Sequence, residues 1–259
     1  MIKKNNNPIA FLDSGVGGIS VLNEAVRMMP NENYMYFGDS KNAPYGTKKT
    51  IEVRDLTERN VEFLLEKGAK AVVIACNTAT SAAADYLRNK YKEIPIIGVE
   101  PALKPAVLNH EGKKILVMAT PMTLAEKKFK NLLSKYEEQA KIIPVPCGGL
   151  MEFVEEGILD GKELDEYLED RISVDLRENA SAVVLGCTHY PFIKESIIKV
   201  IGHDVQIYDG GEGTAKQLQR RLIRDKLLRE STDRGQVQVM NSLDNESIIK
   251  LSEKLLVKL

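Results

Sequence analysis

The sequence lacks an excess of charge of either sign. Its 259 residues carry 36 Lys and Arg against 37 Asp and Glu, a formal net charge of -1. A chain without a basic surplus offers no electrostatic footprint for nucleic acid or for an anionic membrane surface. The most basic stretch, 216–230, spaces its leucines as an amphipathic helix does, and we interpret it as a solvated helix. The composition therefore predicts no nucleic-acid partner and no membrane partner.

Long apolar runs and closely spaced cysteines are also missing. No window approaches the roughly 18 apolar residues that a membrane-spanning helix needs. The first residues hold two lysines and only one short apolar run, 9–12, without a small-residue cleavage pattern, so we expect a strand there and not a signal peptide. The three cysteines are an odd number without a disulfide-like spacing. This pattern favours a reducing cytoplasm in which thiols stay free.

What the chain does contain is a series of strand-like apolar runs, each followed by a helical pattern. This alternation is typical of an α/β protein with parallel sheets. After the last of these runs come helical patterns, one alternating run at 236–240 and a final amphipathic helix from about Glu246. The predicted strands are 9–12, 34–37, 71–75, 94–99, 115–118, 142–145, 182–186 and 205–208.

Several helix boundaries can also be predicted. A helix over 50–67 is expected to stop at Gly68, and Thr123 with Glu126 forms a capping-box pattern. Pro191 stands where a first helical turn begins, with a glycine at position 202 beyond the end of that helix.

The two halves of the chain repeat one another. "AVVIACNT" from Ala71 matches "AVVLGCTH" from Ala182, cysteine on cysteine, with an offset of 187 minus 76, or 111. The strand at Ile9 matches the strand at Ile115 with an offset of 106. Similar offsets at two places indicate a duplication. We therefore predict two similar α/β domains with parallel sheets, related by pseudo-twofold symmetry, with the active site in the crevice between them. The domains would be 1–100 plus 209–259, carrying Cys76, and 101–208, carrying Cys187.

The matched cysteines are the first candidates for chemistry. Both follow a predicted strand, and in open α/β sheets the carboxyl ends of the strands form the ligand crevice. A thiol at a helix N-terminus feels unpaired N–H groups, which lower its pKa. The residues that follow the two cysteines, Asn77, Thr78 and Thr188, can bind a carboxylate. For the third cysteine, Cys147, a place in the core is as well supported as a chemical role.

Two loops are further candidates. The glycine-rich stretch "DSGVGGIS", 13–20, lacks the spacing of a dinucleotide fingerprint and has no following GK[ST], so it does not predict a phosphate loop. We interpret it as a close-approach loop for an anionic ligand, with Asp13 and Ser14 facing the crevice. Asp13 as a plain helix cap is the alternative. The turn-rich stretch 38–48 also follows a strand, where binding residues tend to lie.

Three other functions compete for these residues. A zinc set of Cys76, Cys147, Cys187 and His189 lacks any C-x₂-C spacing, so no metal is predicted. A hydrolase with Cys187 as nucleophile and His189 as base leaves Cys76 without a task. A non-catalytic amino-acid-binding module of two lobes has no need for paired thiols.

Five motifs in this order carry a family resemblance: "DSGVGG", "GDSKNAPYG", "ACNTAT", "GVEPA" and "LGCTHYP". Over about 9–215 the chain resembles the glutamate racemases of the aspartate/glutamate racemase superfamily. The resemblance implies that the protein racemises glutamate without a cofactor and that its product, D-glutamate, is used for peptidoglycan. It also implies a homodimer. Aspartate or another amino acid is the alternative substrate, because the pocket walls set the side-chain length.

The resemblance also implies roles for single residues. Cys76 matches the cysteine that takes the proton from D-glutamate, and Cys187 the one that takes it from L-glutamate. Asp13 is expected near the first thiol and His189 near the second. An assisting glutamate would be Glu155 or, as the alternative, Glu152. The residues that match substrate contacts are Asp13, Ser14, Tyr45, Gly46, Asn77, Thr78, Thr188 and His189.

Overall fold

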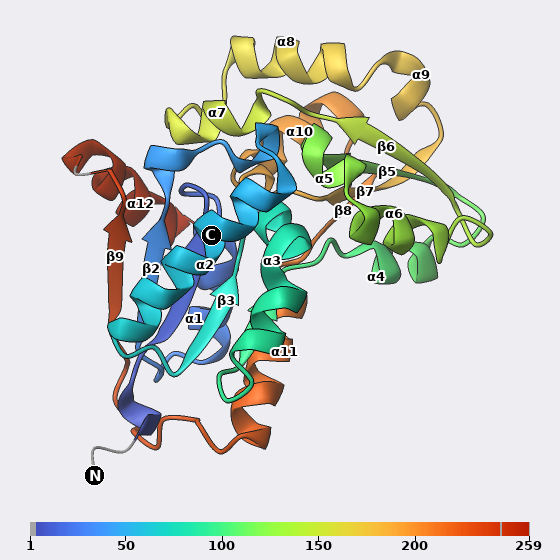
Figure 1. Ribbon diagram of the computed structural model, residues 1–259. Coiled ribbons are helices and arrows are strands. Elements are labelled where there is room, and N and C mark those ends of the chain that lie inside the picture. Colours follow the sequence, from blue (N-terminus) through green and yellow to red (C-terminus); the bar gives the residue numbers. More distant parts are fainter. Residues whose placement is uncertain (1–3, 244, 259) are drawn as a thin grey trace.

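The computed structural model describes residues 4–243 and 245–258 and contains two parallel β-sheets (Figure 1). The first sheet has the strand order β4-β3-β1-β2-β9, and all its pairs are parallel. Its strands are β1 (Ile9–Asp13), β2 (Tyr34–Gly38), β3 (Ala71–Ile74), β4 (Ile96–Gly98) and β9 (Val237–Asn241).

The second sheet repeats this order. Read from one edge it runs β8-β7-β5-β6, which is β4-β3-β1-β2 with every number raised by four. The matching order confirms the predicted α/β class with two similar parallel sheets; β9 is an additional edge strand of the first. The strands of the second sheet are β5 (Lys114–Ala119), β6 (Lys141–Pro146), β7 (Ala180–Leu185) and β8 (Gln206–Asp209).

Helices cover both faces of each sheet. On one face of the first sheet pack α2 (Thr50–Glu66) and α3 (Asn77–Lys90), and on the other pack α1 (Ile19–Met28), α11 (Gly211–Arg224) and α12 (Glu246–Lys258). Because both faces are covered, the central strands are almost wholly apolar, as parallel strands generally are.

The second sheet is covered in the same way. One face packs against α4 (Leu103–Asn109) and α6 (Lys127–Ser134), and the other lies toward α7 (Leu150–Glu155), α8 (Lys162–Arg171) and α10 (Lys194–Ile201). The remaining helical segments are α5 (Pro121–Ala125), α9 (Val174–Arg177) and four 3₁₀ turns: η1 (Lys4–Asn6), η2 (Ser40–Asn42), η3 (Tyr45–Thr47) and η4 (Tyr190–Ile193).

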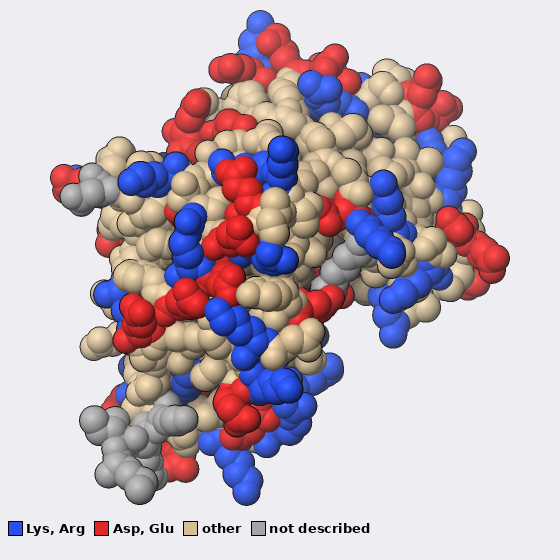
Figure 2. Space-filling view, in the orientation of Figure 1, with Lys and Arg blue, Asp and Glu red and all other residues tan. Residues whose placement is uncertain are grey.

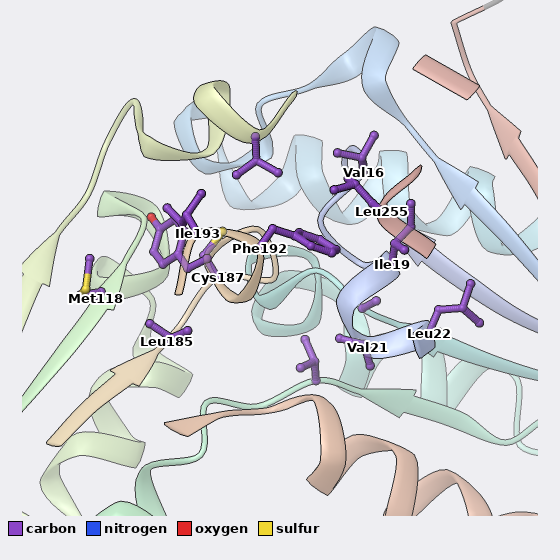
Figure 3. Packing of buried hydrophobic residues seen from close by; sticks show 14 of the residues in the cluster. Val16, Ile19, Val21, Leu22, Met118, Leu185, Cys187, Phe192, Ile193 and Leu255 are labelled. Carbon is purple, nitrogen blue, oxygen red and sulfur yellow. The ribbon is translucent and has the colours of Figure 1, made fainter. Parts of the chain in front are cut away.

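One apolar cluster joins the two sheets. It contains Phe11 and Tyr36 from the first sheet and Met118 and Leu185 from the second. Figure 3 shows how the two sides come together: Phe192, close after Cys187, points toward the α1 side of the cluster. The candidate site is therefore built on a core that both sheets share.

Three predicted boundaries are corrected by the structure. The cap near the start of α5 is Thr120, whose hydroxyl accepts a hydrogen bond from the Thr123 amide, so the predicted capping box at Thr123 was wrong. The helix predicted over 216–230 begins earlier and ends at Arg224, because Lys226 has a left-handed φ of 54°. The strand predicted from residue 94 starts at Ile96, since Ile94 closes a turn.

Charges of both signs are mixed over the surface. On the face in Figure 2, lysine and arginine side chains lie among acidic side chains, and neither sign dominates. Within the described part of the chain, no helix has the length and apolarity needed to cross a bilayer.

Candidate active site

Two cysteines stand at equivalent points of the two sheets. Cys76 follows β3 and is the N-cap of α3, and Cys187 follows β7 after one glycine. Since β3 and β7 hold the same place in the strand order, the thiols lie at the carboxyl ends of matching strands. Both line one small cavity of about 10 Å³, and its wall comes from both sheets: Ser14, Gly46, Cys76, Asn77, Thr78, Thr120, Met151, Gly186, Cys187, Thr188 and His189.

Eight of these lining residues are among those predicted from the sequence, and three are not. Thr120, Met151 and Gly186 were missed. A signal existed for Thr120, because adding the repeat offset of 106 to position 14 gives 120, so Thr120 is the counterpart of Ser14. Met151 comes from α7, and the same offset makes it the counterpart of Tyr45, since 45 plus 106 is 151.

The thiol of Cys76 is buried. Its Sγ accepts a hydrogen bond from the Ala79 amide at 3.5 Å and lies 3.7 Å from Ser14 Oγ. Burial and the nearby carboxylate of Asp13 raise the pKa of Cys76 to about 12. The Ala79 amide at the helix N-terminus does lower this pKa, as expected, but burial and Asp13 outweigh its effect. A single long N–H···S contact does not compensate for the lost hydration of a thiolate.

Asp13 links the first sheet to the second. Thr188 Oγ1 donates to Asp13 Oδ2 at 2.9 Å, and the Gly15 amide donates to Asp13 Oδ1 at 2.8 Å. Burial raises the pKa of Asp13, although these donors and the imidazole of His189 oppose the shift. In this state the Thr188 hydroxyl is engaged with a protein carboxylate.

The thiol of Cys187 has a histidine beside it. His189 Nδ1 lies 3.5 Å from Cys187 Sγ, and His189 Nε2 lies 2.7 Å from Glu155 Oε1. The same carboxylate oxygen accepts the Val16 amide at 2.7 Å. Of the two glutamates considered, Glu155 therefore contacts the histidine, whereas Glu152 is exposed on the outer side of α7.

The charge state of His189 follows from these neighbours. Burial by itself lowers the pKa of His189, but Cys187 and Glu155 together outweigh it and raise that pKa well above its ordinary value. The imidazole is thus stabilised as a cation between two groups that carry or develop negative charge.

The glycine-rich loop 13–20 donates hydrogen bonds to side chains of the protein itself. Its Gly15 and Val16 amides donate to the carboxylates of Asp13 and Glu155. These two donors are therefore used within the protein, while Ser14 of the same loop lines the cavity. The close approach of this loop to an anionic ligand stays a prediction. Asp13 does accept the amide of a following residue, as a cap does, but it also reaches Thr188 of the other sheet.

The remaining predicted contacts divide into two groups. Tyr45 does not line the cavity; its hydroxyl donates to Asp39 at 2.7 Å, because that buried carboxylate requires donors. Gly46, next to it, does line the cavity. Thr78 Oγ1 lies 3.0 Å from Thr123 Oγ1 of α5, which joins the two sides. Asn77 is 6% exposed, and its buried Oδ1 has no hydrogen-bond partner within the described part of the chain.

The structure also bears on the metal alternative. Among residues 4–243 and 245–258, no group of three or more His, Cys, Asp or Glu side chains is arranged to hold a metal ion. Cys147 is buried, and its thiol donates to the Val145 carbonyl at 3.4 Å. Burial raises the pKa of Cys147 to about 12, as expected of a core thiol.

A family model describes most of this chain. The model for Asp/Glu/Hydantoin racemase matches residues 13–218, which include both cysteine motifs. This chain belongs to that family. As an Asp/Glu/Hydantoin racemase family member, it has the two cysteines of its repeated motif facing one cavity.

Several known proteins similar to this family member are named glutamate racemase. The glutamate racemase of Clostridium novyi (strain NT) is 61% identical over 251 residues, 96% of each chain, and that of Clostridium botulinum (strain Alaska E43 / Type E3) is 57% identical over 253 residues, 98% of each. Among solved structures, Francisella tularensis glutamate racemase in complex with D-glutamate has a TM-score of 0.84 at 31% identity, covering 97% of this chain and 94% of that one. Bacillus anthracis glutamate racemase RacE1 has a TM-score of 0.86 at 30% identity, with the same coverage.

Proposed function

We propose that this protein is a glutamate racemase that interconverts L- and D-glutamate without a cofactor, using Cys76 and Cys187 as its two bases. One observation carries the proposal: two thiols at the ends of matching strands line the same cavity. The named relatives at 53–61% identity support glutamate as the substrate.

Racemisation requires a proton to leave one face of the α-carbon and another to arrive on the opposite face. In the direction from L-glutamate, the Cys187 thiolate takes the α-proton and becomes a thiol, while the electron pair stays on the substrate as a carbanion. The Cys76 thiol then gives its proton to the other face and becomes a thiolate. The reverse direction exchanges the two roles, and a proton exchange with solvent restores the starting state.

The cavity wall offers matching groups for an amino acid. The unpartnered Asn77 Oδ1 is an acceptor that a substrate ammonium group satisfies. The amino end of the 14-residue α3, with Thr78 in its first turn, favours a carboxylate. Ser14 and Gly46 add contacts on the first side, and Thr188 on the second. These donors stabilise the carbanion-like state as charge develops.

The cavity of about 10 Å³ has room for about one water molecule and not for glutamate. Substrate therefore enters after the two sides separate. The contacts that must then break include Thr78 with Thr123, Asp13 with Thr188, and Glu155 with Val16. Closure around the substrate remakes them and excludes water.

The proposal extends to the setting of the enzyme. Residues 1–100 with 209–259 form one domain and 101–208 the other, so that opening is a movement between them. The enzyme is a cytoplasmic homodimer, and its D-glutamate is used for peptidoglycan. Light scattering on the purified protein tests the dimer, and limited proteolysis within 99–105 tests the boundary.

Incubation with L-glutamate in D₂O, without added cofactor, tests the activity. Optical rotation and α-deuteration are followed for the wild type, Cys76→Ser and Cys187→Ser. Both serine variants are expected to lose racemisation, whereas Cys147→Ser, the matched control, retains it because a serine can also donate to the Val145 carbonyl. Full activity in Cys76→Ser overturns the two-base assignment. α-Deuteration of L-aspartate but not of glutamate would assign aspartate as the substrate. Binding of glutamate without α-deuteration would indicate a non-catalytic module.

A further inference from the structure

Two glycines of the loop between β1 and α1 lie directly beside the chain of contacts from Glu155 through His189 to Cys187, which we call the histidine relay. A Cβ atom added at Gly17 would lie 2.3 Å from His189 Nδ1, and one added at Gly15 would lie 1.8 Å from Glu155 Oε1. Contacts this short do not occur for real Cβ atoms. The absence of a side chain at these positions is therefore what lets His189 and Glu155 approach the loop.

The backbone conformation gives no other reason for glycine here. Neither Gly15 nor Gly17 is among the positive-φ glycines, so an alanine could adopt the same φ. The loop also binds Glu155 directly, because the Val16 amide between these glycines donates to Glu155 Oε1 at 2.7 Å. His189 and Glu155 follow β7 and β6 of the second sheet, whereas the loop follows β1 of the first.

The relay is thus a chain of contacts that starts in one sheet and ends at the thiol of the other. Val16 N–H binds Glu155, Glu155 binds His189 Nε2, and His189 Nδ1 lies 3.5 Å from Cys187 Sγ. Each link fixes the orientation of the next, so a shift of the imidazole changes its contact with the thiol directly.

We propose that Gly15 and Gly17 are positioning residues for Cys187: in the loop after β1 they form a socket that receives Glu155 of α7 and His189 of the segment after β7. The relay is complete only when the two sides are closed, which confines proton transfer at Cys187 to the closed state. Cys76 Sγ contacts Ser14 Oγ and the Ala79 amide, and no histidine lies beside it among the residues that the structure describes. The socket therefore serves one of the two bases.

This inference rests on the proposed racemisation and predicts an asymmetry. The two enantiomers have equal free energy, so kcat/KM falls equally in both directions in any variant. Hydrogen exchange does differ, because α-deuteration of D-glutamate in D₂O needs only the Cys76 step, and α-deuteration of L-glutamate needs the Cys187 step. A displaced His189 slows the second exchange and spares the first.

The test is Gly17→Ala, with Gly213→Ala in α11 as the matched control, since a Cβ at Gly213 meets nothing within 4 Å. Gly17→Ala is expected to lower racemisation and the α-deuteration of L-glutamate by about 100-fold, the usual scale of general acid–base assistance, while α-deuteration of D-glutamate persists. The control is expected to match the wild type in all three rates.

A double variant separates positioning from misfolding. Gly17→Ala combined with His189→Ala removes the ring with which the new methyl collides, so it is expected to fold and to be no slower than His189→Ala alone. Equal loss of both exchange reactions in Gly17→Ala, or full retention of both, overturns the proposal. So does a double variant slower than His189→Ala.

The protonation of His189 can be measured without catalysis, and this measurement tests the proposal separately from the proposed function. ¹⁵N NMR of histidine-labelled protein reports the protonation of His189, identified by its loss in His189→Ala. Gly17→Ala is expected to lower the pKa of His189 because the ring leaves Cys187, one of the two groups that raise it. An unshifted titration overturns the positioning role even if the wild type racemises glutamate. A shifted titration in a protein without racemase activity overturns only the function.

Discussion

Thr188 Oγ1 donates a 2.9 Å hydrogen bond to Asp13 Oδ2, and this bond joins the carboxyl ends of β7 and β1, one from each sheet. Asp13 in turn is the largest source of charge that raises the pKa of Cys76. One buried carboxylate therefore connects the closure of the two sides to the protonation of the first thiol.

The Asp13→Asn variant tests this connection. Asparagine keeps the size of the side chain and removes its charge, so the pKa of Cys76 is expected to fall below about 12, although burial still holds it above the ordinary value. The thiolate absorbance is titrated in a background of Cys147→Ser and Cys187→Ser, where Cys76 is the remaining thiol. An unchanged titration would show that Asp13 exerts no charge effect on Cys76.

The stability of the fold is expected to decrease at alkaline pH, in part through Cys76. Burial raises the pKa of this thiol from 9.0 to about 12 in the folded protein. Below pH 9 the thiol keeps its proton in both the folded and the unfolded protein, so its contribution to the free energy of unfolding is complete. Above it the unfolded thiol ionises and the folded one does not, and the free energy of unfolding falls by up to about 1.4 kcal/mol per pH unit.

Urea unfolding of the wild type and Cys76→Ser across this range measures the contribution. Other buried groups titrate in both proteins, so the difference between the two curves isolates the thiol. We expect the advantage of the wild type to shrink as pH rises from 9 toward 12. Parallel curves would contradict a raised pKa.

Glu155→Gln and Glu152→Gln form a matched pair on neighbouring positions of α7. Glutamine at 155 can still accept the Val16 amide, but the negative charge that helps to raise the pKa of His189 is lost. We expect racemisation to fall by about 100-fold, the lower end of the usual range for acid–base assistance. Glu152 is exposed, so its substitution is expected to leave the rate unchanged. The reverse order would assign the assisting role to Glu152.

Asn77→Ala separates binding from stability. Because Asn77 Oδ1 is buried without a partner, its removal is expected to leave the melting temperature unchanged or higher. Loss of its hydrogen bond to the substrate ammonium costs about 1.5–3 kcal/mol of binding, which is roughly a 10- to 100-fold rise in KM. Calorimetric melting and steady-state kinetics provide the two values. A large drop in melting temperature with unchanged KM would show a purely structural role.

The sequence by itself determined the strands, their repeated order and the two cysteine motifs. These features are local: a strand buried on both faces needs a continuous apolar run, such as 71–74 or 182–185, and the residue after it must turn toward the ligand side. The repeat then predicted that Cys76 and Cys187 occupy equivalent ends. The strand offset of 106, applied to Ser14, predicts Thr120 as well.

Only the tertiary structure decided which side chains meet between the sheets. That Glu155 contacts His189 while Glu152 does not, that Tyr45 turns to Asp39, and that the glycine loop receives protein groups all depend on contacts between distant segments. The pKa of Cys76 belongs to the same class, because burial, which no local pattern reports, outweighs the helix N-terminus. Local patterns set which elements form, whereas desolvation and charge at the site are sums over neighbours that only the folded chain brings together.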